Sequence, residues 1–215
     1  FVDSMMSADV HIEEGWPVHI GLDFGLTPAA VFGQKMQNGR WHVVHELVAF
    51  DMGLERFCHH LLADIQQHFP KSDVLIWGDP AGVKRDEIFE VTAFEHLRTM
   101  GLHARPTSTN DFMVRREAGA MPMNRLIDGK PGLLVNRSCV KTRKSLAGGY
   151  HFKRMAVGAG QERFRDVPNK NQHSHVGDAF GYLMLGAGKV RNITGNSQFS
   201  NQFKQATANM DFNIF

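Results

Sequence analysis

The chain has 215 residues, 42% of them hydrophobic, and a formal net charge of +2 at pH 7. This length and apolar content predict one domain with a sizeable core. The small net charge by itself gives no sign of a nucleic-acid partner. No apolar run approaches the roughly 18 residues that a membrane span needs, and the two cysteines, Cys58 and Cys139, cannot form a disulfide framework. We therefore expect a soluble, intracellular protein with no membrane partner.

Hydrophobic periodicity predicts strands first and then alternating helices and strands. Apolar residues alternate with polar or small ones from residue 18, Asn38-Gly39 is a strong hairpin signal, and apolar residues later recur at helical spacing. In chain order, the pattern predicts strands over 18–24, 30–36 and 41–49, a helix over 54–69, a strand over 74–77, a helix over 87–100, a strand over 102–105, a helix over 112–127, a strand over 133–135 and a helix over 176–187. This order indicates an α/β domain with a mixed sheet, in which a three-strand antiparallel meander joins parallel strands flanked by helices.

Composition divides the chain into three parts. Residues 1–15 look like a linker remnant, which indicates a fragment of a longer protein, and residues 16–188 carry the predicted domain. Residues 189–215 contain five Asn, three Gln and four Phe and carry little charge. This composition predicts a flexible tail or a short segment that docks on a partner.

Basic residues are concentrated in one stretch of the chain. From Gly129 to Gln161 there is no acidic residue, whereas seven of the 24 lysines and arginines fall there. Clustering of this kind favours an anion-binding surface, and a solvated face is the alternative.

Three aspartates lie where a strand ends or a helix begins. Asp23 ends the first predicted strand, Asp79 follows the strand over 74–77, and Asp178 falls in the first turn of the last predicted helix. Each alone could be a turn residue or could complement a helix dipole. Because a carboxylate among apolar neighbours needs a compensating cation or hydrogen bonds, the three together predict one shared cation site. Carboxylate oxygens suit Mg²⁺ and Mn²⁺, and two such ions would support phosphodiester hydrolysis.

Helix geometry places Asp178 outside the apolar stripe, so we expect it to face a cleft beside the core, with His175 and Tyr182 on the same flank. His175 is predicted either to orient the attacking water or a ligand, or to be a core histidine. Glu46, near the end of the third strand, is a weaker candidate for an extra ligand.

Three short motifs occur in order: Gly78-Asp79-Pro80-Ala81-Gly82, Leu146-x-Gly-Gly149-Tyr150-x-Phe152 and Ser174-His175-x-x-Asp178-Ala179-x-x-Tyr182. Together they resemble the C-terminal nuclease domain of phage large terminase subunits, which is a ribonuclease H-like domain of the DNA-packaging motor. The resemblance covers residues 18–188. It implies a metal-dependent endonuclease that cuts concatemeric double-stranded DNA by a two-metal mechanism with low sequence specificity. The metal-binding acids of that family carry over to Asp23, Asp79 and Asp178, with Mg²⁺ or Mn²⁺ as the cofactor.

The resemblance also implies partners and a setting. The phosphate backbone would be held by Lys84, Arg85, Lys141, Arg143, Lys144, Lys153 and Arg154. The packaging ATPase domain of the same polypeptide, whose Gly-x-x-x-x-Gly-Lys-Ser/Thr loop this chain lacks, is one expected partner. A portal or procapsid and a small terminase subunit are others, in the cytoplasm of an infected bacterium.

Asparagine at Asp23, Asp79 or Asp178 is expected to abolish cleavage while leaving the fold and DNA binding largely intact.

Other interpretations stay open. Asp23-Phe24-Gly25-Leu26-Thr27 also resembles the first phosphate loop of actin-like and sugar-kinase ATPases, so the chain could be a fragment of one. A resolvase or transposase-type nuclease would share the fold and the metals, and a non-catalytic module could bind DNA or a capsid. The twelve histidines, including the pair His42 and His45, lack cysteine or carboxylate partners at ligand spacing, so no zinc site is predicted.

Overall fold

The structure, a computed structural model, describes residues 1–7, 10–25, 27–84, 91–156 and 162–188, and for residues 154–156 and 162–166 it describes the backbone alone. The predicted tail over 189–215 lies outside these residues. Within them, no helix is both long enough and apolar enough to cross a bilayer.

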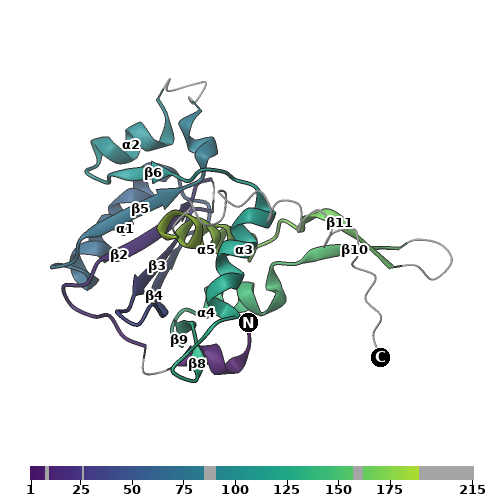
Figure 1. The fold of residues 1–215 in the computed structure, drawn as a ribbon. Helices are drawn as coiled ribbons and strands as arrows, with labels where there is room; N and C mark the ends of the chain where they lie inside the picture. Colours follow the sequence, from purple (N-terminus) through teal and green to yellow (C-terminus); the bar gives the residue numbers. More distant parts are fainter. Residues whose placement is uncertain (8–9, 26, 85–90, 157–161, 189–215) are drawn as a thin grey trace.

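A seven-stranded mixed sheet forms the centre of the molecule, in the order β1-β9-β4-β3-β2-β5-β6 (Figure 1). The strands are β1 (Met6–Ser7), β2 (Val18–Asp23), β3 (Ala29–Lys35), β4 (Trp41–Val48), β5 (Val74–Gly78), β6 (Ala104–Pro106) and β9 (Leu133–Asn136). Strands β2, β3 and β4 form the predicted antiparallel meander, and the other strands pair in parallel with their neighbours. The predicted mixed sheet is therefore confirmed.

Helices cover both faces of the sheet (Figure 1). They are α1 (Leu54–His68), α2 (Ala93–Thr99), α3 (Phe112–Met123), α4 (Val140–Lys144) and α5 (Ser174–Ala187), with short helical turns η1 (Asp3–Met5), η2 (Pro80–Val83) and η3 (Ser145–Gly149). Helices α1 and α2 share one core cluster with Ile20, Leu22 and Phe32 of the sheet. Helices α3 and α5 share a second cluster with Val31 and Val43, on the opposite face. Side chains therefore alternate between two cores along each central strand.

Helix α5 lies directly on the backbone of β2 because Gly21 has no side chain. A Cβ atom at Gly21 would lie 2.0 Å from the carbonyl oxygen of Ala179 and 2.4 Å from the backbone nitrogen of Leu183. A second close approach occurs on β5, where a Cβ atom at Gly186 of α5 would lie 2.2 Å from the Trp77 ring. These contacts place the N-terminal turns of α5 beside the end of β2.

The N-terminal segment differs from the expected linker. Met6–Ser7 adds an edge strand that pairs with β9, and Val10 is only 1% exposed within the α1-side core. The side-chain amide of Gln34 accepts a hydrogen bond from the backbone of Glu13 and donates one back to it. Parts of residues 1–15 therefore pack against the domain, with Met5 and Val10 buried in it.

Two helices differ from their predicted bounds, and two antiparallel strand pairs were not predicted. Of the predicted helix over 87–100, residues 87–90 lie outside the described residues, and the described helix begins at Ala93, because Thr92 forms a capping box with Glu95. Helix α3 ends at Met123, one residue after Pro122, instead of continuing to residue 127. The antiparallel pair β10 (Phe152–Ala156) and β11 (Glu162–Pro168) projects away from the sheet (Figure 1), and β7 (Leu126–Ile127) pairs with β8 (Lys130–Pro131).

Candidate active site

Two of the three aspartates lie at the same edge of the sheet. Asp23 is the last residue of β2, and Asp79 follows the last residue of β5. Because β2 and β5 are parallel neighbours, their carboxyl ends meet at this edge. Helix α5 begins beside the end of β2, which brings Asp178 to the same place.

Asp23 and His175 form a hydrogen-bonded pair. The Nδ1 atom of His175 lies 2.9 Å from Oδ2 of Asp23, whose residue is 7% exposed. Burial raises the pKa of Asp23, the hydrogen bond to His175 opposes that rise, and the charge of Asp178 adds to it. The hydrogen bond to Asp23 in turn raises the pKa of His175. An ionised Asp23 can only accept, so Nδ1 of His175 donates to it.

Asp178 is enclosed by three donors rather than facing an open cleft, which corrects the expectation from helix geometry. Its residue is 1% exposed, and its Oδ1 atom accepts hydrogen bonds from Nη1 of Arg115 at 2.5 Å and from the Tyr150 hydroxyl at 3.1 Å. The ammonium group of Lys170 binds Oδ2. The Arg115 side chain is 8% exposed and that of Lys170 is 67% exposed, so Asp178 has one buried and one accessible cation. Burial and the Asp178 carboxylate raise the pKa of Tyr150, whose hydroxyl therefore stays protonated as a donor.

Asp79 is half-buried and is joined to the same network through Tyr182. Its Oδ1 atom accepts a hydrogen bond from the backbone nitrogen of Ala81 at 2.8 Å, which caps η2. Burial raises the pKa of Tyr182, and the neighbouring Asp79 carboxylate raises it further. The guanidinium carbon of Arg115 lies 4.6 Å from the centre of the Tyr182 ring. The fold thus brings all three predicted aspartates into one connected region.

Four members of this network were not predicted as site residues: Arg115, Tyr150, Lys170 and Tyr182. Tyr150 belongs to a motif whose glycines form the turn η3, with Gly148 at φ +106°. The side-chain amide of Asn171 donates to the carbonyl of Gly149 at 2.9 Å, which fixes this turn against the N-terminus of α5. The signal for Tyr150 was therefore in the sequence, whereas nothing local marks Arg115 or Lys170 as partners of Asp178.

The potential metal ligands of the aspartate site are carboxylate oxygens, so its chemistry fits a hard divalent cation. The mutual repulsion of Asp23 and Asp178 would be relieved by such a cation. The three carboxylates are nevertheless not a compact ligand set. Among the described residues, one group of three ligand atoms lies within 4.8 Å of one another, and it consists of His45, Asp64 and His68.

Glu46, predicted as an extra ligand, is held at the N-terminus of α4. Its oxygens accept hydrogen bonds from the backbone nitrogen of Lys141 at 2.8 Å and from the backbone nitrogen and hydroxyl of Thr142, both at 2.7 Å. A carboxylate in this position satisfies donors that the first helical turn leaves unpaired. This capping role accounts for its position.

The predicted phosphate-binding cations differ in how accessible they are. The exposed ones are Lys84, Lys144 and Lys153. The ammonium group of Lys141 donates to a backbone carbonyl at 3.2 Å and lies 4.7 Å from the Phe50 ring centre, and Arg143 donates to the carbonyl of Arg137 at 2.8 Å. Arg85 and the side chain of Arg154 lie outside the described residues.

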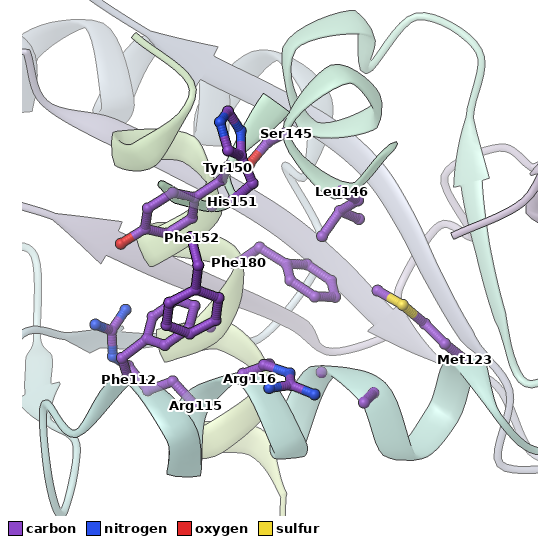
Figure 2. A pocket seen from close by; sticks show the side chains of 14 residues that line it. Phe112, Arg115, Arg116, Met123, Ser145, Leu146, Tyr150, His151, Phe152 and Phe180 are labelled. Carbon is purple, nitrogen blue, oxygen red and sulfur yellow. The ribbon is translucent and has the colours of Figure 1, made fainter. Parts of the chain in front are cut away.

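A largely apolar pocket of about 560 Å³ adjoins the aspartate site between α3, α5 and η3 (Figure 2). Phe112, Tyr150 and Phe152 group at one end of it, with the Phe112 ring centre 5.4 Å from each of the other two (Figure 2). Arg115 and Tyr150, which both bind Asp178, belong to its wall, whereas the three aspartates do not. The pocket therefore lies beside the carboxylates, which do not line it.

Comparison with known proteins identifies the fold. No protein-family model matches the chain, and no curated protein matches it by sequence. The structure is similar to the large terminase of a thermophilic bacteriophage, with a TM-score of 0.61 and 17% identity over 85% of this chain and 44% of that one. The chain thus spans less than half the length of that protein.

Two separate nuclease domains are matched over most of their length. The nuclease domain of the P22 large terminase gives a TM-score of 0.60 with 10% identity, over 89% of this chain and 93% of that one. The large terminase nuclease from thermophilic phage G20c with bound cobalt gives 0.50 and 12%, over 84% and 93%. The chain therefore has the ribonuclease H-like fold of phage large-terminase nuclease domains.

Proposed function

We propose that this chain is the nuclease domain of a viral DNA-packaging terminase and hydrolyses phosphodiester bonds of concatemeric double-stranded DNA with low sequence specificity. The observation that carries the proposal is the pair of buried carboxylates Asp23 and Asp178: His175, one helical turn before Asp178 on α5, is hydrogen-bonded to Asp23 at the end of β2. Asp178 is already paired with Arg115 and Lys170, and a divalent cation that displaces the accessible Lys170 would balance both carboxylates. Their occurrence in a fold that is shared with terminase nucleases supports a nuclease.

Asp23, Asp79 and Asp178 are the proposed ligands of two divalent ions, Mg²⁺ or Mn²⁺. The cobalt bound in the similar phage nuclease supports a divalent ion here. Asp178 offers Oδ2 only when the accessible Lys170 moves away, because Oδ1 is held by Arg115 and Tyr150. When bound, the ions supply an activated water and stabilisation of the leaving oxygen.

The protein side chains position this chemistry. His175 binds Oδ2 of Asp23 and so leaves Oδ1 for ligation, while Arg115 and Tyr150 fix the orientation of Asp178. The exposed lysines hold the phosphate backbone, which positions DNA without reading its sequence. These lysines are Lys84, Lys144 and Lys153, with Arg85 and Arg154 as further candidates.

The proposed setting follows from the same similarity. The packaging ATPase domain of the same polypeptide, a portal or procapsid, and a small terminase subunit are the proposed partners, in the cytoplasm of an infected bacterium. An ATPase of the actin-like class would require nucleotide binding by this chain, which calorimetry with ATP can exclude.

Cleavage of supercoiled plasmid tests the proposal. The chain is incubated with Mn²⁺, Mg²⁺ or EDTA beside the variants Asp23→Asn and Asp79→Asn. Asp51→Asn is the matched control, because Asp51 is exposed and has a φ of 47° that asparagine tolerates. We expect cleavage that needs the metal, persists in the control and is lost in both site variants. Cleavage in EDTA, or full activity in Asp23→Asn, would contradict the proposal.

A further inference from the structure

A second ligand cluster lies on the face of the sheet opposite α5. His45 is on β4, and Asp64 and His68 are on α1. His45 pairs in the sheet with Phe32, whose ring belongs to the α1-side core and whose centre lies 4.9 Å from the imidazole centre. Asp23 and α5 lie on the other face, so this cluster is separate from the aspartate site.

The three side chains converge at ligand distance. Nε2 of His45 lies 2.7 Å from Oδ2 of Asp64, and the imidazole centres of His45 and His68 are 4.7 Å apart. One ligand atom from each residue falls within 4.8 Å of the other two. Asp64 and His68 are one helical turn apart and therefore share a face of α1. Asp64 is the carboxylate partner of His45. Because the two are not neighbours in the sequence, only the tertiary structure brings them together.

Two imidazole nitrogens and one carboxylate oxygen are a ligand set suited to Zn²⁺. Ligand atoms of a tetrahedral zinc ion are ~3.4 Å apart, from bond lengths of about 2.0–2.2 Å. The three ligand atoms lie within 4.8 Å of one another, so zinc binding would draw the widest pair together and would separate the His45 and Asp64 atoms from their 2.7 Å hydrogen bond. The His45 and Asp64 side chains are 25% and 22% exposed, which leaves the site accessible to an ion from solution.

We propose that His45, Asp64 and His68 bind a single Zn²⁺ ion, with the fourth coordination position open to water. The ion links the C-terminal half of α1 to strand β4 and stabilises the docking of that helix on the sheet. It is independent of the nuclease metals, which need oxygen ligands and lie on the other face. No zinc partner was expected for the pair His42 and His45. His45 is now a proposed ligand, whereas both ring nitrogens of His42 are buried, among the described residues, without a hydrogen bond.

Calorimetric titration of the full chain with Zn²⁺ tests the site, in the parent and in Asp23→Asn, which removes a ligand of the other metal site. We expect one zinc equivalent whose affinity is the same in both proteins and falls at least about tenfold in His68→Ala and Asp64→Asn. His59→Ala and His60→Ala are matched controls, because both histidines are exposed on the same helix, and their affinity should equal that of the parent.

Two further readouts do not depend on activity. Zinc at a hundredfold excess over its dissociation constant is expected to raise the melting temperature by about 5–10 °C in the parent and the controls, but not in His68→Ala. Co²⁺ as a probe is expected to give the visible absorption of a tetrahedral complex that is lost in Asp64→Asn, a variant that preserves side-chain shape if His68→Ala does not fold. Equal zinc affinity in Asp64→Asn and His60→Ala, or zinc binding that Asp23→Asn abolishes, would overturn the proposal and leave His45 and Asp64 as an ion pair alone.

Discussion

Replacing Asp178 with asparagine is expected to destabilise the fold as well as to remove a proposed metal ligand. The Asp178 and Arg115 side chains are 1% and 8% exposed, so the substitution leaves a buried guanidinium without its counter-charge. Removing one partner of a buried ion pair costs about 3–5 kcal/mol. Asparagine keeps one acceptor oxygen for Arg115, which places the expected loss near ~3 kcal/mol. For a chain of this size, that loss lowers the melting temperature by about 6–12 °C.

Urea and thermal unfolding of four proteins measure this effect as a double-mutant cycle. The proteins are the parent, Asp178→Asn, Arg115→Met and the double variant. Because the double variant has no unpaired buried charge, it should be more stable than Asp178→Asn alone. A free energy of unfolding for Asp178→Asn within ~0.5 kcal/mol of the parent value, or a double variant as unstable as the sum of the single ones, would refute the buried pair.

The three aspartates differ in how much the fold depends on their charge. The sequence alone led us to expect that asparagine at each of the three positions would leave the fold intact. The structure supports that expectation for Asp79, which is half-buried and caps a short turn, but not for Asp178. Loss of cleavage in Asp178→Asn is therefore not diagnostic unless the variant is shown to be folded at the assay temperature.

Three further perturbations test the site and its support. Gly21→Val should lower the free energy of unfolding by about 3 kcal/mol or more, because even a Cβ atom there would lie 2.0 Å from a backbone oxygen of α5; an unchanged urea midpoint would contradict this close approach. Lys170→Met should lower the Mn²⁺ concentration for half-maximal plasmid cleavage several-fold, because it removes the accessible cation from Oδ2 of Asp178, and an unchanged requirement would show that Lys170 does not compete with the ion. The pKa of His175 is raised from 6.5, so its contribution to stability is fully present below that value and is lost as the pH rises through the raised pKa. The difference in free energy of unfolding between the parent and His175→Gln should therefore fall from about 1 kcal/mol near pH 6 toward zero at alkaline pH. A difference that does not change with pH across this range would count against the pair with Asp23.

The sequence predicted those features that depend on neighbours along the chain. Alternation over residues 18–49 and the Asn38-Gly39 turn predicted the meander, and helical spacing predicted α1 and α5. The positions of Asp23 and Asp79 at strand ends followed from the strands themselves. The start of α2 was missed because its capping box lies inside a stretch that also fits a longer helix.

The partners of the aspartates were decided by the tertiary structure alone. Asp23 and His175 are 152 positions apart, and Asp178 and Arg115 are 63 apart. Hydrophobic period and turn chemistry act over a few residues, so they cannot specify which donors meet across such distances. Only the packing of α5 on the bare backbone at Gly21, and of α3 on α5, brings these groups together. The same reason applies to His45 and α1: the sequence determined the strand and the helix, and their packing determined that three ligands meet.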